Sequence, residues 1–267
     1  GEIVDVSVSA SPIYNSAGEI VGASVTSRDI GERKRVQQLQ DDLDRSEFVS
    51  QIAHELRTPL TIIAGLTEML AGRAQNLPPE EVDRSLSALD RQSRRALVLI
   101  NDLLDLSRLS RGTFVIDLTD VPLRDVVAAA LDSTTPPEGF TTDVSVPDDI
   151  IVAADQRRLE QVFVNLFTNS YRYGGQKLSV VARSADSTVV EVQITDDGPG
   201  VDPTLQDQLF EPFVAGKSST SSGLGLAITK RLVEAFGGKI EYDPSASGAS
   251  FRVYLPCGNQ SDKGIST

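Results

Sequence analysis

Apolar and polar residues alternate over residues 1–30, as they do in half-buried strands. Val4, Val6 and Val8 alternate with polar neighbours, residues 15–18 have turn chemistry, and the alternation resumes at Val21. Two strands do not form a stable domain by themselves. We therefore predict a β-hairpin that ends a larger sheet domain. Because the sequence begins within this pattern and without Met, we expect it to be a fragment.

From Gly31 onward the apolar spacing becomes that of a helix. Val36, Leu39 and Leu43 form a short seam within residues 31–46, which we predict to be a coiled-coil linker. A second seam with spacings of three and four consists of Val49, Ile52, Leu56, Pro59, Ile63, Leu66 and Leu70. The interval from Leu43 to Val49 is six residues rather than seven, so the seams are out of phase. This phase slip is either a harmless local bend or a two-state element that passes rotation along the helix.

A second amphipathic helix follows a turn at residues 76–79, and Gly112 ends it. Its seam consists of Val82, Leu86, Leu89, Ser93, Ala96, Ile100, Leu103 and Ser107. Residues 47–112 are therefore predicted to form an all-α antiparallel helical hairpin. One hairpin cannot cover both seams well, so we expect a homodimer that completes a four-helix bundle. The alternative is that the seam packs on the next domain.

After Gly112 the pattern becomes a mixture of strands and helices. The predicted strands are residues 113–118, 141–146, 150–153, 178–183, 189–195, 239–242 and 250–255. The predicted helices are residues 123–132, 155–173 and 223–236. This order predicts an α+β two-layer sandwich over residues 113–257. Residues 258–267 are polar and lack periodicity, so we expect a flexible tail.

Composition narrows the possible classes of protein. The formal net charge of −13 argues against nucleic-acid binding, which needs a basic surface. The single cysteine, Cys257, excludes an internal disulfide and fits a reducing cytoplasm. The sequence has no signal peptide and no apolar run near the roughly 18 residues of a membrane span. We expect a cytoplasmic fragment without a membrane segment, and the sequence leaves open a membrane anchor elsewhere in the full-length protein.

His54 is the only histidine, and its place in the second seam predicts that it faces water. With Val49 at heptad position a, His54 falls at f, the position farthest from the seam. A histidine buried in a core is the alternative, and the heptad phase disfavours it. An exposed imidazole beside Glu55 is a candidate nucleophile with an adjacent base. Pro59 removes a helical hydrogen bond, so we expect a kink just after His54.

Two polar motifs in the sandwich have the chemistry to bind a ligand. Asn165 and Asn169 lie four residues apart on one face of a predicted helix, where their amides suit a polar ligand or a hydrated metal ion. Asp196 follows a predicted strand, and Gly198 and Gly200 let the backbone approach a ligand closely. Each motif alone is weak, because a polar helix face or an ordinary turn would explain it equally well.

A third motif lies farther along the chain. Residues 209–214 contain two phenylalanines, and the serine-rich residues 215–222 have few packing groups. Gly223 and Gly225 then open a helix, whose backbone N–H groups and dipole favour phosphate. Lys217 has the charge to meet a phosphate. Close packing is the alternative explanation for the two glycines.

The order of these motifs is more specific than any one of them. Over residues 31–256 the chain resembles the sensor histidine kinases of two-component systems. The block around His54 resembles the family's phosphoacceptor box. The N, G1, F and G2 boxes of the family resemble residues 155–173, 196–200, 209–213 and 223–228. The first hairpin and its exit at residues 28–34 resemble the end of a PAS sensor domain.

The resemblance implies a dimerisation and phosphotransfer hairpin followed by a Bergerat-type ATP-binding domain. His54 would attack the γ-phosphate of ATP, and Glu55 would accept its proton. Thr58 would orient water when the protein removes phosphate from the aspartate of its partner. The resemblance therefore implies ATP and Mg²⁺ as cofactors, and a homodimer and a response regulator as partners.

The resemblance also implies which residues bind the nucleotide. Asn165 and Asn169 would help to hold Mg²⁺ and the phosphates, and Asp196 would bond the adenine amino group. The other positions expected around the nucleotide are Arg172, Tyr173, Gly198, Gly200, Lys217, Gly223, Leu224, Gly225 and Leu226. Ser221 departs from the family pattern, which often has glycine there, and this affects the expected lid rather than nucleotide binding.

Two other classes of protein stay as alternatives. A Bergerat-fold ATPase would turn over ATP without forming phosphohistidine, and a non-catalytic dimeric scaffold would bind no nucleotide. The complete hairpin around His54 disfavours the first, and the retained ATP-site residues disfavour the second.

Overall fold

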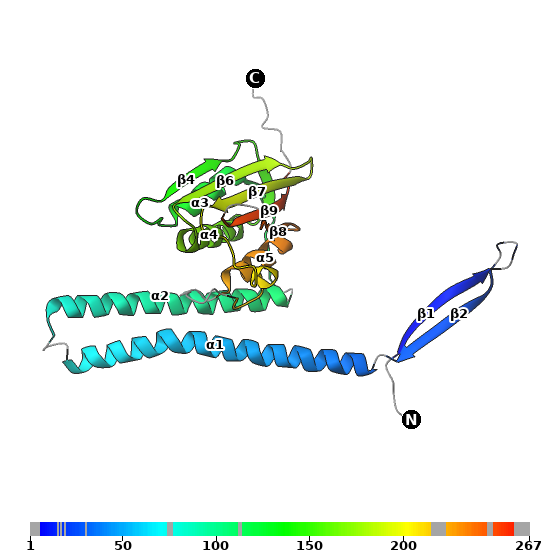
Figure 1. Ribbon diagram of the computed structural model, residues 1–267, viewed down its shortest axis with the longest axis horizontal. Coiled ribbons are helices and arrows are strands. Elements are labelled where there is room, and N and C mark those ends of the chain that lie inside the picture. The colour runs from blue at the N-terminus through cyan, green and yellow to red at the C-terminus, as the bar shows by residue number, and fades with distance from the viewer. Residues whose placement is uncertain are drawn as a thin grey trace, which may run out of the picture. The chain divides into compact units, whose positions relative to one another are not determined.

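The computed structural model describes residues 6–14, 16, 18, 20–29, 31–73, 77–111, 114–214, 223–244 and 248–258 (Figure 1). The chain divides into two compact units, residues 1–76 and 77–267. None of the helices in the described ranges has both the length and the apolar character needed to cross a membrane.

The first unit consists of a β-hairpin and one long helix. Strands β1 (Val6–Tyr14) and β2 (Ile20–Asp29) pair antiparallel, as the alternating pattern predicted. Helix α1 (Gly31–Arg73) follows and runs through Pro59 without a break. Its ribbon curves along its length (Figure 1), which is the milder of the effects that an internal proline produces.

The predicted linker and the first helix of the predicted hairpin are therefore one continuous helix. The side chains of residues 31–48, which include Val36, Leu39 and Leu43, lie outside the described residues. The phase slip between the two seams thus stays a prediction.

The second unit begins with helix α2 (Pro79–Ser110). Proline suits the first turn of a helix, where the N–H has no partner within the helix. Glu80 and Glu81 in the same turn complement the positive end of the helix dipole. Farther along, Leu99 and Leu106 lie seven residues apart on one face, and both are buried.

The rest of the second unit is a two-layer α+β sandwich, as predicted. Its strands are β3 (Thr119–Pro122), β4 (Thr141–Ser145), β5 (Ile151–Ala154), β6 (Lys177–Ser184), β7 (Val189–Asp196), β8 (Lys239–Tyr242) and β9 (Ser250–Pro256). Its helices are α3 (Leu123–Asp132), α4 (Gln156–Tyr173), the short 3₁₀ helix η2 (Gln206–Gln208) and α5 (Gly225–Ala235).

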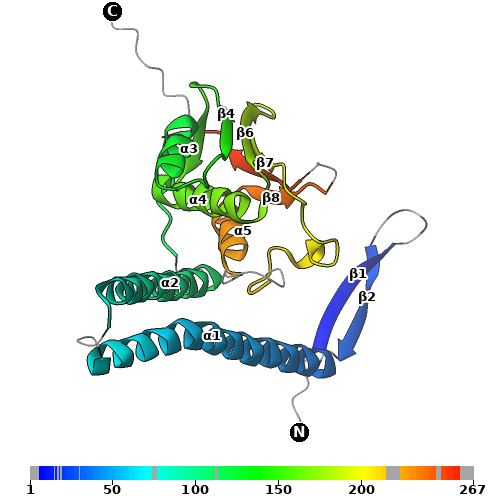
Figure 2. The same ribbon diagram turned by 60° about the vertical axis from the view of Figure 1, so that its left-hand side comes forward.

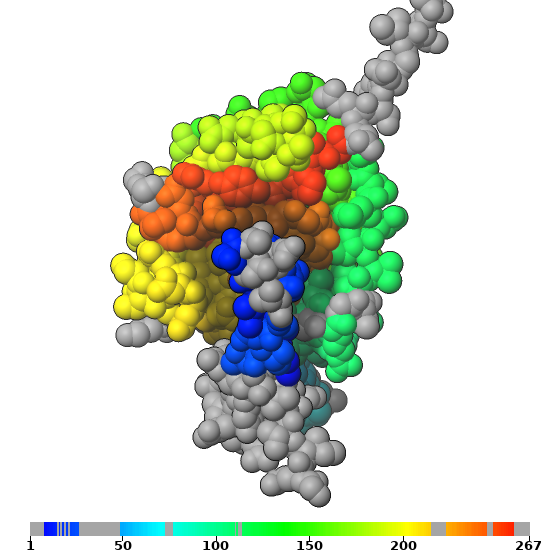
Figure 3. Space-filling view, turned by 90° about the vertical axis from the view of Figure 1, so that its right-hand side faces the viewer, coloured from blue at the N-terminus to red at the C-terminus, as the bar shows by residue number. Residues whose placement is uncertain are grey.

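Five strands form the main sheet in the order β4-β6-β7-β9-β8. Strand β4 runs parallel to β6, and the other neighbours are antiparallel. Strands β7, β9 and β8 appear as successive yellow-green, red and orange bands in Figure 3. Helices α3, α4 and α5 lie on one face of the sheet (Figure 2). Strands β3 and β5 form a separate antiparallel pair.

The prediction of a strand at residues 113–118 is wrong. The described residues 114–118 have no regular structure, and strand pairing begins only at Thr119, opposite Ala154 of β5. The side chain of Val115 is 90% exposed, and Phe114 instead packs under the Arg158 guanidinium, 4.6 Å from the ring centroid. Alternation of polar and apolar residues is a local signal, whereas a strand also needs a neighbouring strand to pair with. In this region β5 pairs with β3 and not with residues 114–118.

The core lies between the main sheet and its helices. Val190, Val192 and Ile194 of β7 are buried, and they alternate with residues that are more accessible or polar. On α4, the fully buried rings of Phe163 and Phe167 stack with centroids 5.9 Å apart. Since Asp196 continues the buried alternation of β7, its carboxyl emerges on the helix-covered face of the sheet.

Candidate functional site

A cavity of about 580 Å³ lies within the second unit. Helices α2 and α4 and the start of α5 form part of its wall. The end of β7 with the segment that follows it, and β9 with the residue that precedes it, form the rest. The lining residues are Arg95, Val98, Leu99, Asp102, Asn165, Thr168, Asn169, Arg172, Tyr173, Asp196, Gly200, Val201, Asp202, Leu205, Leu209, Val214, Gly223, Gly225, Leu226, Ala249 and Phe251.

The carboxyl of Asp196 is held in place by backbone donors. Its Oδ1 accepts hydrogen bonds from the N–H groups of Gly198 and Ala249, each at 3.1 Å. The residue is only 5% exposed, and it lines the cavity. A buried carboxylate with one oxygen fixed in this way can present its other oxygen to a donor group of a ligand.

Close backbone packing explains the glycines around Asp196. A Cβ atom at Gly198 would lie 2.6 Å from the Cα of Gly174, and one at Gly248 would lie 2.0 Å from the Asp196 carbonyl oxygen. Gly198 does not line the cavity, whereas Gly200, with a φ of +75°, does. The tight turn therefore contributes to the site mainly by placing Asp196 and Gly200.

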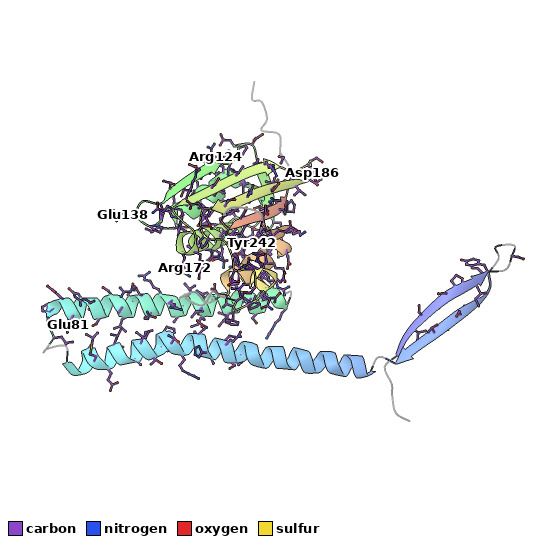
Figure 4. The ribbon with its side chains drawn as sticks, in the orientation of Figure 1. Glu81, Arg124, Glu138, Arg172, Asp186 and Tyr242 are labelled. Atoms are coloured by element: carbon purple, nitrogen blue, oxygen red, sulfur yellow. The ribbon has the colours of Figure 1, made fainter. Side chains whose placement is uncertain are left out.

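The next residues are held by an adjacent strand. The N–H of Val201 donates to the hydroxyl oxygen of Tyr242 at 3.1 Å, and Tyr242 belongs to β8 (Figure 4). The second carboxyl of the turn, Asp197, accepts from the N–H groups of Gln176 and Lys177, each at 2.8 Å. These bonds lower the pKa of Asp197, with the largest effect from Lys177.

Asn165 and Asn169 bring two amide groups to the cavity from successive turns of α4. Asp155 caps this helix by accepting from the Arg158 N–H at 3.1 Å, so the predicted start of the helix is confirmed to within one residue. The Nδ2 of Asn165 donates to the carbonyl oxygen of Gly225 at 3.3 Å. This bond engages the nitrogen end of the amide and leaves the amide oxygen, a metal-ligand type, to the cavity that Asn165 lines.

The residues that the structure describes contain no group of three or more His, Cys, Asp or Glu side chains that could hold a metal ion. The amide oxygens of Asn165 and Asn169 fit Mg²⁺, which takes oxygen ligands and usually binds through one or two protein groups together with substrate phosphates.

The residues just before α5 contact residues 209–214 through their backbone atoms. The N–H of Phe213 donates to the Gly223 carbonyl at 3.0 Å, and both residues have positive φ angles, of 64° and 66°. A Cβ atom at Gly223 would lie 2.7 Å from the Phe213 carbonyl carbon, so only glycine fits. Gly223, Gly225 and Leu226, which the sequence placed around a nucleotide, line the cavity. Leu224 is fully buried beside it, and Lys217 lies outside the described residues.

Sequence patterns did not predict the wall formed by α2. Arg95, Val98, Leu99 and Asp102 line the cavity from one helix face, with spacings of three and four. The sequence signal for this wall was weak, because a charged residue within an amphipathic helix normally indicates the solvent side. Burial raises the pKa of the Asp102 carboxyl to about 6, and repulsion from Asp105 adds to the effect.

A half-buried ion pair ties the end of α2 to α4. Asp105 accepts from Arg158 at 2.7 Å, and their side chains are only 13% and 24% exposed. The Gln161 amide adds bonds to Asp105 at 3.4 Å and from Arg158 at 2.8 Å. This network holds the α2 wall against α4.

The predicted phosphoacceptor stands on α1, in the first unit. His54 is exposed, as its heptad position predicted, and Glu55 beside it is half-buried. The Thr58 hydroxyl is exposed and donates to the His54 carbonyl oxygen at 3.4 Å. The imidazole is therefore accessible to a second protein or domain.

Comparisons with known proteins agree with this geometry. Residues 154–259 match the family described as histidine kinase-, DNA gyrase B-, and HSP90-like ATPase, and residues 44–112 match the His Kinase A (phospho-acceptor) domain. The sensor histidine kinase TrcS of Mycobacterium tuberculosis is 34% identical over 82% of this chain and 45% of its own length. The alginate biosynthesis sensor protein KinB of Pseudomonas aeruginosa is 31% identical over 92% of this chain and 42% of its own. The chain thus spans less than half the length of either relative.

Solved structures are similar in fold. The Acinetobacter baumannii histidine kinase AdeS has a TM-score of 0.63 and 28% identity, and the match covers 77% of this chain and 98% of that one. Full-length ShkA in complex with AMPPNP has a TM-score of 0.59 and 25% identity, over 80% of this chain and 46% of that one. The matches and the fold of the second unit therefore define a His Kinase A (phospho-acceptor) domain followed by a Bergerat-type nucleotide-binding domain. The chain belongs to the sensor histidine kinases.

Proposed function

We propose that this chain is the catalytic part of an ATP-dependent protein-histidine kinase that phosphorylates His54. The observation that carries the proposal is the exposed imidazole of His54 within the phosphoacceptor match, in a chain that also has a cavity lined by Asn165, Asn169 and Asp196. The complex of ShkA with AMPPNP supports a nucleotide as the ligand of this cavity.

In the proposed reaction, one ring nitrogen of His54 attacks the γ-phosphorus of ATP. A bond forms between this nitrogen and phosphorus, and the bond from phosphorus to the β–γ bridging oxygen breaks, so that ADP leaves. The proton on the other ring nitrogen passes to Glu55, which leaves the phosphohistidine neutral at its ring. The water exposure of His54 is what this mechanism requires, because a buried imidazole could not meet a phosphate donor.

The residues of the cavity have separate binding tasks. The free oxygen of Asp196 would accept from the exocyclic amine of adenine, and the oxygens of Asn165 and Asn169 would hold Mg²⁺. When bound, Mg²⁺ supplies positive charge that offsets the charge on the phosphates. Arg172, in the last turn of α4 (Figure 4), and Tyr173 would contact the nucleotide at the mouth of the cavity. Gly223, Gly225 and Leu226 would offer backbone groups to the phosphates, with Lys217 as an added charge.

Two partners follow from the proposed reaction. An aspartate of a response regulator would receive the phosphoryl group from His54, and Thr58 would orient water in the reverse, phosphatase reaction. A second copy of the chain would complete a four-helix bundle. Apolar side chains that stay exposed on α2, such as Leu86, Leu97 and Ile100, support such a dimer. We further propose that residues 1–30 end a PAS-like sensor domain.

Labelling with γ-³²P-ATP and Mg²⁺ tests the proposed function. We expect the label to be stable in base and labile in acid, as phosphohistidine is. His54→Gln should remove it, while Asp83→Asn, an exposed change on α2, should leave it intact. Persistence of the acid-labile label in His54→Gln would show that another residue accepts the phosphoryl group.

A further inference from the structure

The orientation of the Asn165 amide has a structural cause. A side-chain amide has two N–H donors at one end and an oxygen acceptor at the other. The Nδ2 of Asn165 donates to the Gly225 carbonyl at 3.3 Å and to Thr229 Oγ1 at 3.5 Å. Because both interactions engage the nitrogen end against α5, Oδ1 is the end that remains for the cavity, which Asn165 lines.

Thr229 acts on the cavity only through Asn165. Its side chain is 0% exposed and is not among the groups that line the cavity. It lies one helical turn after Gly225, so the two acceptors for Asn165 stand one above the other on α5. Most of this face of α5 is apolar and buried, including Ile228 and Leu232. A hydroxyl there needs a polar neighbour, and the Asn165 amide is one.

We propose that Thr229 is a positioning residue: it holds the Asn165 amide against α5, where the Gly225 carbonyl, which can only accept, selects the nitrogen end and leaves the oxygen for the bound ligand. The proposal rests on the proposed function, since it assigns Asn165 to the Mg²⁺–nucleotide complex. Mg²⁺ binds oxygen, so an amide turned by 180° would present N–H groups where a ligand oxygen is needed. The Gly225 carbonyl opposes this rotation because it can only accept a hydrogen bond, and Thr229 keeps the amide within reach of that carbonyl. Loss of the Thr229 hydroxyl therefore weakens Mg²⁺ binding without abolishing it.

Two substitutions separate this role from simple packing. Thr229→Val removes the acceptor and keeps most of the volume, whereas Thr229→Ser keeps the acceptor and removes a buried methyl group. If Thr229 serves packing alone, Thr229→Ser should be the worse variant in every measurement. If it positions Asn165, Thr229→Val should be the worse variant for Mg²⁺, even where Thr229→Ser unfolds at the lower temperature.

The measurement is a calorimetric titration of Mg²⁺ into the protein–ADP complex, with ADP binding in EDTA measured in parallel. For Thr229→Val we expect the half-saturating Mg²⁺ concentration to rise roughly fivefold, as for loss of one neutral hydrogen bond, and ADP affinity in EDTA to stay unchanged. Thr229→Ser should bind Mg²⁺ like the unchanged protein. In an Asn165→Ala background, Thr229→Val should have no further effect on Mg²⁺.

Equal Mg²⁺ affinity of Thr229→Val and the unchanged protein would overturn the positioning role and leave the proposed function standing. If the protein without substitutions binds ADP with the same affinity in the presence and absence of Mg²⁺, the metal role of Asn165 is overturned. The positioning role of Thr229 then falls with it. If Thr229→Val does not fold, Thr229→Ala replaces it. Thr229→Ala differs from Thr229→Ser by the hydroxyl alone. If Thr229 positions Asn165, Thr229→Ala should bind Mg²⁺ more weakly than Thr229→Ser.

Discussion

The raised pKa of the Asp102 carboxyl makes the folding stability of the α2 wall depend on pH. Its pKa rises from 3.8 to about 6 because the group is buried, and the charge of Asp105 adds to the rise. Asp105 and Arg158 are paired nearby, and Arg95, Arg172, Asp196 and Asp202 are the other charged side chains that line the cavity. Below about pH 4 the carboxyl is neutral in both folded and unfolded chains, so burial has no ionic cost. Above about pH 6 it is ionised in both, and the folded state carries the full cost of about 3 kcal/mol.

Asp102→Asn should therefore stabilise the second unit at neutral pH and not at acid pH. We expect a gain of up to about 3 kcal/mol in the free energy of unfolding at pH 7.5, which shrinks as the pH falls from about 6 toward 4. Urea unfolding at a series of pH values measures this gain. The exposed Asp83→Asn on the same helix is the control and should show no such dependence. A constant difference between Asp102→Asn and the unchanged protein at all pH values would contradict the explanation.

Single residues also show which parts of the candidate site can be predicted from the sequence. Asp196, Asn165 and Asn169 line the cavity, and they could be singled out from the order of several motifs and the resemblance that it carries, because each spacing alone is weak. Asp102 could not, since its environment depends on which distant surface α2 packs against. The sequence placed Gly198 near the ligand. In the structure, its close contact with the backbone of Gly174 explains why a glycine is needed there. The sequence spacing does not identify Gly174 as that neighbour.

Between elements, α2 and α4 are joined by the pair of Asp105 and Arg158, which is far less exposed than the pair of Arg94 and Asp90. Removal of one member of a buried pair leaves the other charged and without its partner, whereas an exposed pair is screened by water. The two pairs therefore offer a matched comparison of how firmly α2 is held.

Asp105→Asn should loosen the end of α2 from α4. We expect a loss of about 1–3 kcal/mol, seen as faster amide hydrogen exchange over residues 99–109. Asp90→Asn should change exchange there by less than about 0.5 kcal/mol, because its pair is exposed. Equal exchange rates in the two variants would indicate that the Asp105 pair does not hold the helix.

Most helices and strands followed from periodicity, because one buried face imposes a regular spacing on each. Periodicity failed at residues 113–118, where alternation was present and a neighbouring strand was not. It also could not predict that β3 and β5 would pair apart from the main sheet, since pairing depends on residues far away in sequence.

In the whole molecule, the predicted phase slip lies within α1, after the N-terminal β-hairpin and before His54. An insertion of one residue between Leu43 and Val49 would bring the two seams into register. We expect this insertion to change the ratio of the proposed kinase and phosphatase activities, measured with a response regulator as phosphoryl acceptor. An insertion of seven residues at the same point preserves the slip and serves as the control. If both insertions give the same ratio, the slip is only a local bend.

Tyr173 ends α4 at the cavity, where the residue is 41% exposed and the Arg172 guanidinium lies 6.0 Å from the ring centroid. The chain contains no tryptophan. A Tyr173→Trp substitution would therefore introduce the only indole of the protein at the cavity that we assign to the nucleotide. Its fluorescence would report occupancy of that cavity directly, without a labelled ligand and without a second tryptophan in the chain.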